Sequence, residues 1–230
     1  MKEKFSLKKV LKAHPEYWYI LFVPCYLICF FIVEHLVPSD GDYWVSYLPL
    51  DDKIPFLEGF VFPYCMWYPL LIFVGVWLMV GDVPEFKKYM RFLIIGFGFT
   101  LAFCLVFPNG QDLRPLPFER QNFCTWLLGR LYAADTNTNV LPSMHVIGCA
   151  AATAGAFSAR CGLRKWRWGV AVLSVFICAS TVFVKQHSIL DLLAGIAVSI
   201  PIALILYLPK RKGDRSCRRK KVEKISLKNS

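Results

Sequence analysis

The sequence predicts an all-α integral membrane protein, a six-helix bundle whose two termini both lie in the cytoplasm. Its 230 residues are 56% hydrophobic and 16% aromatic, and the mean hydropathy is +0.45. A soluble domain of this length is markedly less apolar. Two further observations carry the prediction, namely the lengths of the apolar runs and the placement of the positive charges.

Six apolar runs are candidates for membrane helices. Three have the full length of roughly 17–25 residues that spans a hydrocarbon core of ~30 Å, and one is adequate. The other two are short and need their neighbours, 142–144 and 166–168, to span. No small-residue cleavage site follows the first run, so we expect it to remain as an anchor. In chain order the six runs cover 17–36, 60–80, 92–108, 145–159, 169–184 and 189–208.

Lysine and arginine concentrate on one side of the predicted bundle. If the chain crosses the membrane six times with both ends inside, 22 of its 27 Lys and Arg residues fall on the cytoplasmic side. Five precede residue 17, three lie in 81–91, four lie in 160–168 and ten follow residue 208. Because cytoplasmic loops accumulate Lys and Arg, this asymmetry supports both the count and the orientation.

The segment 209–230 is predicted to be a basic cytoplasmic tail. It directly follows the last apolar run, so its expected partner is the anionic lipid headgroup and not nucleic acid. We treat 1–230 as a single membrane domain, since no linker divides it. The nine cysteines include no CxxC pair, so they indicate neither a metal nor a redox cofactor. Of the two long outer loops, 37–59 is expected to lie along the membrane interface, and 109–141 is the longest polar stretch.

Five cations remain on the outer side, and their grouping indicates a bound anion. Cations are scarce on that side, yet these lie near predicted helix ends. If the helices pack as one bundle, three outer ends converge and a pocket forms there. The five cations are Lys53, Arg114, Arg120, Arg130 and Lys185.

His187 and Asp191 are four residues apart in the stretch QHSILD, so a helix places them on one face. A carboxylate beside an imidazole holds one ring nitrogen as a donor and leaves the other free, which is how a nucleophile or a base is oriented. Alternatively, Asp191 only complements the positive end of the last helix, and His187 lies among headgroups. An ionisable residue within an apolar membrane segment favours a functional role.

The stretch PSMH at 142–145 marks the start of a predicted helix. Pro142 suits the first helical position, so the N–H groups of Ser143, Met144 and His145 would point outward and form a site for a phosphate. The Ser143 hydroxyl can add a donor, and His145 could deliver a proton to a leaving oxygen. A helix start alone explains Pro142 and Ser143, but it does not explain the histidines and arginines on the same side.

Three motifs together resemble the signature of the type 2 phosphatidic acid phosphatase superfamily. They are Arg-Pro at 114–115, PSMH at 142–145, and the series Ser180, His187 and Asp191. Their order along the chain and their places between the predicted helices agree with that family, whose members are membrane phosphatases and phosphotransferases with a six-helix core.

The resemblance implies a role for each residue that matches. His187 would attack the phosphorus and become a phosphohistidine, and Asp191 would orient it. His145 would protonate the leaving group, while Arg114 and Ser143 would hold the phosphoryl oxygens. No metal or other cofactor is then needed, because phosphoryl transfer rests largely on positioning and on neutralising charge.

The chain departs from the family pattern at three positions. The family has Lys where this chain has Phe107 and Arg where it has Thr181, so two phosphate-binding cations are missing. Lys185 and Arg120 are the nearest replacements, and we expect them to help bind the phosphate. Met144 replaces the usual Gly, as in the branch that includes inositol phosphorylceramide synthases and sphingomyelin-synthase-like phosphotransferases.

The resemblance covers residues 90–205, which would form the catalytic core, and it implies an integral membrane phosphatase. We expect it to hydrolyse a lipid phosphate, of the phosphatidic acid type or an isoprenoid pyrophosphate, at the extracytoplasmic face of a bacterial-type plasma membrane. An alternative keeps the phosphohistidine but transfers the phosphoryl group to a lipid or sugar hydroxyl. A remote alternative is a non-catalytic transporter whose polar residues line a path.

Overall fold

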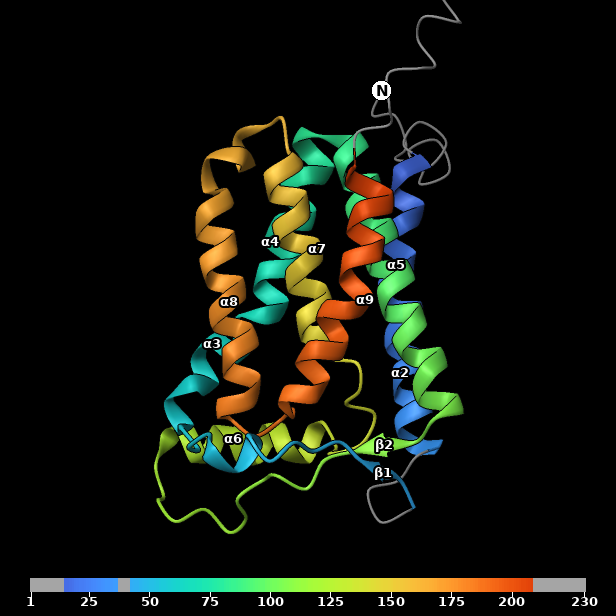
Figure 1. Cartoon of the computed structure of the whole chain (residues 1–230). Coiled ribbons are helices and arrows are strands. Elements are labelled where there is room, and N and C mark those ends of the chain that lie inside the picture. The colour runs from blue at the N-terminus through green and yellow to red at the C-terminus, as the bar shows by residue number, and fades with distance from the viewer. Residues whose placement is uncertain (1–14, 37–41, 209–230) are drawn as a thin grey trace, which may run out of the picture.

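The computed structural model describes residues 15–36 and 42–208, and most of them are helical (Figure 1). The predicted basic tail lies outside the described residues. Five helical stretches are long and apolar enough to cross a membrane. The protein is therefore mostly helical and membrane-embedded. The five stretches are Pro15–Leu36, Glu58–Gly81, Val83–Val106, Gly162–Phe183 and Ile189–Tyr207.

Each of the six predicted apolar runs contains a helix, and short elements connect them. The helices of the bundle run roughly parallel or antiparallel to one another (Figure 1). In chain order the elements are η1 Pro15–Leu21, α2 Phe22–Leu36, β1 Trp44–Val45, η2 Asp51–Lys53, η3 Glu58–Phe60, α3 Val61–Cys65, α4 Trp67–Gly81, α5 Val83–Val106, β2 Asn109–Gly110, α6 Phe123–Ala134, α7 Met144–Ser158, η4 Gly162–Trp166, α8 Arg167–Phe183 and α9 Ile189–Tyr207.

Helix α7 is shorter than each of the five long helical stretches and lies at the centre of the bundle. Its 15 residues rise about 22 Å at ~1.5 Å per residue, which is less than a hydrocarbon core of ~30 Å. It packs against α4, α5, α8 and α9. The prediction of six crossings thus has a helix at each expected place, but α7 is too short by itself to establish the sixth crossing.

Small residues allow the neighbouring helices to approach α7 closely. A Cβ atom on Gly148 would lie 2.8 Å from Nε1 of Trp67, and one on Gly155 would lie 3.1 Å from Cδ1 of Leu78. On the side of α5, Gly96 leaves room for Ile147. Interfaces of this kind are typical of membrane helices, where close packing replaces the hydrophobic driving force. They hold the N-terminus of α7 at a defined depth.

The predicted polar loop 109–141 contains a helix that the sequence analysis did not anticipate. Helix α6 begins with Asn122, whose side chain accepts a hydrogen bond from the backbone N–H of Thr125, while the Thr125 hydroxyl accepts one from the backbone N–H of Asn122. This reciprocal cap stabilises the helix start. Helix α6 and the parallel pair of β1 and β2 cover one end of the bundle (Figure 1).

Helix α5 begins well before the apolar run predicted at 92–108. Asp82 caps it by accepting a hydrogen bond from the Glu85 N–H, and Pro84 occupies its first turn. Three cations, Lys87, Lys88 and Arg91, lie in its first half. Charged residues end an apolar run but do not end a helix, which explains the difference. This start of α5 lies at the same end of the bundle as η4, opposite α6 (Figure 1).

Replacing Gly195 by alanine should weaken the packing of α9 on α7. The new Cβ would lie 2.8 Å from Cβ of Val146 and 2.9 Å from the backbone oxygen of Ser143, and neither atom can rotate away. Overpacking of this kind costs about 1–3 kcal/mol. Thermal unfolding of the purified variant in detergent should show a lower midpoint. Gly98→Ala is the control, because nothing lies within 4 Å of its Cβ; equal losses in both variants would contradict the close approach.

Candidate active site

Three side chains predicted from the sequence form a continuous chain of contacts at the end of the bundle covered by α6. Nδ1 of His187 lies 3.2 Å from Oδ2 of Asp191. Nε2 of His187 lies 3.2 Å from Nδ1 of His145. His187 is buried, and Asp191 has no exposed surface. Because a carboxylate can only accept from the imidazole, Nδ1 of His187 carries the proton in this arrangement and Nε2 offers its lone pair.

The start of α9 positions this chain. Ser188 caps the helix, and its side chain accepts a hydrogen bond from the Leu190 N–H. Oδ2 of Asp191, in the first turn, accepts a 2.9 Å hydrogen bond from the Ser188 N–H as well as contacting His187. The cap therefore fixes the carboxylate, and the carboxylate fixes the ring of His187.

The described part of the outer loop 37–59 contributes directly to the site, a role that the sequence analysis did not predict. Ser46 follows β1 and donates a 2.5 Å hydrogen bond to Oδ1 of Asp191. Asp51 accepts a 2.6 Å hydrogen bond from the Ser188 hydroxyl and a 2.9 Å bond from the Ile189 N–H. Ser46 and Asp51 are fully buried. The polar groups at the start of α9 draw this loop inward, because buried donors need acceptors.

The start of α7 differs by two residues from the prediction. The helix begins at Met144 with Ser143 as its cap, so Pro142 precedes the cap and does not occupy the first helical position. The N–H of Ser143 donates to the backbone oxygen of Asp191 at 3.1 Å and is not free to bind a phosphate. No side chain caps the helix. The expected phosphate cradle is thus reduced to the first helical N–H groups and the hydroxyl of Ser143, which is buried without a partner.

Aromatic rings hold His145 in place. Its ring centroid lies 4.8 Å from that of Tyr64 and 4.4 Å from that of Trp67, which come from α3 and α4. Trp67 in turn packs where Gly148 has no side chain. The imidazole therefore has a fixed orientation, with Nδ1 toward His187 and the rest of the ring toward a pocket.

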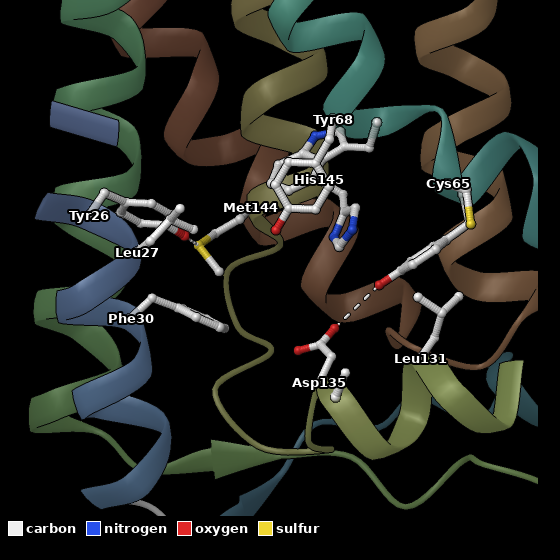
Figure 2. Close-up of a pocket in the computed structure, with 12 residues that line it drawn as sticks. Tyr26, Leu27, Phe30, Cys65, Tyr68, Leu131, Asp135, Met144 and His145 are labelled. Atoms are coloured by element: carbon white, nitrogen blue, oxygen red, sulfur yellow. Dashed lines mark hydrogen bonds between the residues drawn. The ribbon is translucent and has the colours of Figure 1, made fainter. Parts of the chain in front are cut away.

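The pocket beside His145 has a volume of about 310 Å³ and is largely apolar. Figure 2 shows His145 at one wall and Asp135 at another, with the carboxylate of Asp135 hydrogen-bonded to the Tyr64 hydroxyl. The residues lining the pocket come from α2, α3, α4, α6 and the start of α7 and are Tyr26, Leu27, Phe30, Tyr64, Cys65, Trp67, Tyr68, Leu131, Ala134, Asp135, Met144 and His145.

Met144, the third residue of the PSMH stretch, contacts α2 across the pocket. The hydroxyl of Tyr26 donates a hydrogen bond to the sulfur of Met144 (Figure 2). A glycine at this position has no side chain with which to make the contact. The longer residue thus joins the start of α7 to α2, and both side chains line the pocket.

Arg114 is half-buried beside α6 and close to Asp135. Its guanidinium group donates to the backbone oxygens of Tyr132, Asp135 and Thr136 at 3.1, 2.8 and 2.6 Å. Its Nε is buried and has no partner. Burial lowers the pKa of Arg114 from its ordinary value, and the Asp135 carboxylate opposes that shift. The guanidinium stays charged, because an arginine in a protein does not lose its proton.

Lys185 and Arg120 form contacts away from the histidines. Nζ of Lys185 donates to the backbone oxygens of Asp51 and Ile54 at 2.8 and 2.7 Å. Arg120 is exposed, and its guanidinium lies 3.4 Å from the carboxylate of Glu58. Both cations therefore bind residues of the predicted loop 37–59, and neither contact includes His145 or His187. Their expected role at a phosphate has no support from these contacts.

Several residues of the site were not anticipated from the sequence. Asp135 lies at the end of α6 and its carboxylate accepts a 2.9 Å hydrogen bond from Nε2 of Gln186. Burial raises the pKa of Asp135 above its ordinary value, and Glu34 adds to the increase, whereas His187 and Arg114 oppose it. Asp135 opens the stretch that leads to PSMH, but an acidic residue in a loop carries no periodic signal. Nothing in the local sequence indicates its place.

These features define a mostly helical, membrane-embedded protein with an Asp–His–His chain at one end of its bundle. No protein-family model matches the chain, and neither a curated protein nor a solved structure shows significant similarity to it. Among the described residues, no group of three or more His, Cys, Asp or Glu side chains is arranged to hold a metal ion.

Asp51→Ala should destabilise the start of α9. The change removes the acceptor of the Ser188 hydroxyl and of the Ile189 N–H, and buried donors without a partner cost about 1–3 kcal/mol each. Thermal unfolding should show a clear loss of stability. Asp52→Ala is a matched control, because the neighbouring carboxylate is exposed and binds only the Tyr47 hydroxyl among the described residues. If both variants unfolded alike, Asp51 would not support α9.

Proposed function

We propose that this protein is a membrane phosphatase that cleaves a lipid phosphate through a phosphohistidine on His187. The observation that carries the proposal is the contact chain from Asp191 through His187 to His145. Nδ1 of His187 contacts the carboxylate of Asp191, and Nε2 of the same ring faces the imidazole of His145. A nucleophile, the group that orients it and a general acid need this relationship.

In the first step, the lone pair on Nε2 of His187 attacks the phosphorus. The bond from phosphorus to the alcohol oxygen breaks, its electron pair stays on that oxygen, and His145 supplies the proton. Asp191 stabilises the positive charge that develops on the ring of His187. The two imidazoles contact each other in the free protein, so the phosphoryl group must separate them when it binds.

In the second step, a water oxygen attacks the phosphorus of the phosphohistidine. His145 takes the proton from the water, the bond between Nε2 and phosphorus breaks, and His187 recovers its lone pair. The phosphoryl oxygens would be neutralised by Arg114 and by donors at the start of α7, including the Ser143 hydroxyl. The Nε of Arg114 and the Oγ of Ser143 have no hydrogen-bond partner among the described residues, so both can donate to a phosphoryl oxygen.

The pockets support a substrate with a long apolar chain. The pocket beside His145 adjoins a second one of about 410 Å³ between α2, α4 and α5, which is lined almost entirely by apolar side chains. Both pockets are lined by Tyr26, Leu27, Trp67 and Tyr68. A lipid could therefore place its chain in the apolar pocket while its phosphate ester lies near His145.

We place the site on the extracytoplasmic side of the membrane. His145 and His187 lie at the starts of α7 and α9, at the bundle end covered by α6, β1 and β2 (Figure 1). The basic segments 87–91, in α5, and 160–167, which includes η4, lie at the opposite end of the bundle (Figure 1). Because positive loops stay in the cytoplasm, the site would face the other compartment.

His187→Ala should lower the rate of phosphate release from every substrate of a lipid phosphate panel by about a thousandfold or more. No other described group is placed to replace the nucleophile. Wild-type protein quenched in alkali after reaction with a labelled substrate should carry an acid-labile phosphoryl group that the variant lacks. His35→Ala is the control, since its ring is exposed and, among the described residues, contacts the backbone oxygen and the ring of Phe31 on the same helix. Full activity of His187→Ala would overturn the covalent mechanism.

His145→Ala should slow cleavage of alkyl phosphates far more than cleavage of aryl phosphates. An alkoxide leaves poorly without a proton, whereas a phenolate does not need one, and a general acid contributes about 10²–10⁴-fold. The measurement compares kcat/KM for a long-chain alkyl phosphate and a nitrophenyl phosphate. Equal losses on both substrates would assign His145 a role other than proton transfer.

A further inference from the structure

The pocket beside His145 contains the carboxylate of Asp135, which forms no ion pair with a cation among the described residues. Oδ2 of Asp135 accepts hydrogen bonds from the Tyr64 hydroxyl at 3.3 Å and from Nε2 of Gln186 at 2.9 Å, and both donors are neutral. Within residues 15–36 and 42–208, no Lys, Arg or His nitrogen lies within 4.0 Å of this carboxylate. The other oxygen points into the pocket (Figure 2).

The surroundings of Asp135 favour a positively charged ligand. A buried carboxylate is costly unless a cation or several donors compensate it. Arg114 is close, but its two terminal nitrogens donate to backbone oxygens. Glu34 of α2 accepts hydrogen bonds from the N–H and hydroxyl of Thr136, next to Asp135, and adds a second negative charge. Two carboxylates thus lie near this part of the pocket.

The other walls of the pocket are aromatic. A cation bound over the faces of several aromatic rings is stabilised by their quadrupoles, and ammonium groups are recognised in this way. The rings belong to the three helices α2, α3 and α4, so they surround the space from several sides (Figure 2). They are Tyr26, Phe30, Tyr64, Trp67 and Tyr68.

We propose that this pocket binds an ammonium group on the alcohol that the phosphate releases, and that Asp135 is the residue that selects it. The inference rests on the proposed function, since His145 in the same pocket is the group that protonates the departing alcohol. The alcohol oxygen would lie at His145 and the ammonium group at Asp135. Because both residues line the same small pocket, the oxygen and the ammonium group must be close together in the substrate. The preferred substrate is therefore the phosphate ester of an amino alcohol.

The amino alcohol has two possible sources, and the experiment distinguishes them. In one, the ammonium lies on the chain-bearing alcohol, as in 2-ammoniohexadecyl phosphate. In the other, it lies on a short headgroup alcohol, as in hexadecyl phosphocholine. Hexadecyl phosphate has the same chain without the cation and is the reference. Purified full-length protein should cleave one of the cationic esters with kcat/KM about tenfold or more above the reference, as expected for a cation between a carboxylate and aromatic faces.

Asp135→Asn should lower this preference by about tenfold, because the amide keeps the shape of the side chain and removes its charge. The ratio of kcat/KM values is the readout, so a general loss of activity does not imitate the effect. Tyr68→Leu, at an exposed position of the wall, should lower the ratio by a few fold. Asp112→Asn is the matched control, since that exposed carboxylate hydrogen-bonds to Tyr43 and Asn137 in the outer loops.

A binding measurement separates failure of this inference from failure of the proposed function. The His187→Ala variant in lipid nanodiscs should bind 2-aminohexadecan-1-ol more tightly than hexadecan-1-ol, as followed by displacement of a fluorescent alkylammonium probe. Adding Asp135→Asn should remove the difference. Equal binding of the amine and the alcohol, or an unchanged amine preference without Asp135, would overturn the inference. Absence of phosphohistidine and of phosphate release, with the amine preference intact, would instead reject only the phosphatase.

Discussion

The site depends on the buried carboxylate of Asp191 and on the polar groups collected around it. Its oxygens bind the ring of His187, the N–H of Ser188 and the hydroxyl of Ser46. Its backbone oxygen accepts the N–H of Ser143 at the start of α7. One residue therefore joins the starts of α7 and α9 and the outer segment at β1. A buried carboxylate is stable only when such donors compensate it, so the interactions hold one another in place.

The packing of α7 provides the other constraint. A short helix surrounded by four others can bring its first turn to the site only if the neighbouring helices approach closely. Glycine at positions 148, 155, 96 and 195 allows that approach, and each is met by a large or branched side chain of a neighbouring helix. Trp67, which packs at Gly148, also stacks on His145. The packing of the apolar core and the orientation of a site residue are thus parts of one arrangement.

The charges of the molecule are separated along the bundle axis. Basic side chains gather around η4 and the start of α5, while the other end holds the histidines, Asp135 and Glu34. The guanidinium of Arg114, at the same end, donates to the backbone oxygen of Asp135, and its contacts with the end of α6 leave only Nε without a partner. An acidic, aromatic pocket beside the proposed phosphate site suits a substrate that carries charges of both signs.

The sequence by itself determined the helical class, the positions of the six apolar helices and the contact between His187 and Asp191. These are local properties, since run length and a spacing of four residues act within one helix. The contact of His145 with His187 follows from their two motifs only when α7 and α9 pack together. The tertiary structure alone decided the places of Ser46, Asp51 and Asp135 and the contacts of Lys185 and Arg120. Their partners lie far away in the chain, and hydrogen bonds between loops and helix starts have no period that a sequence can display.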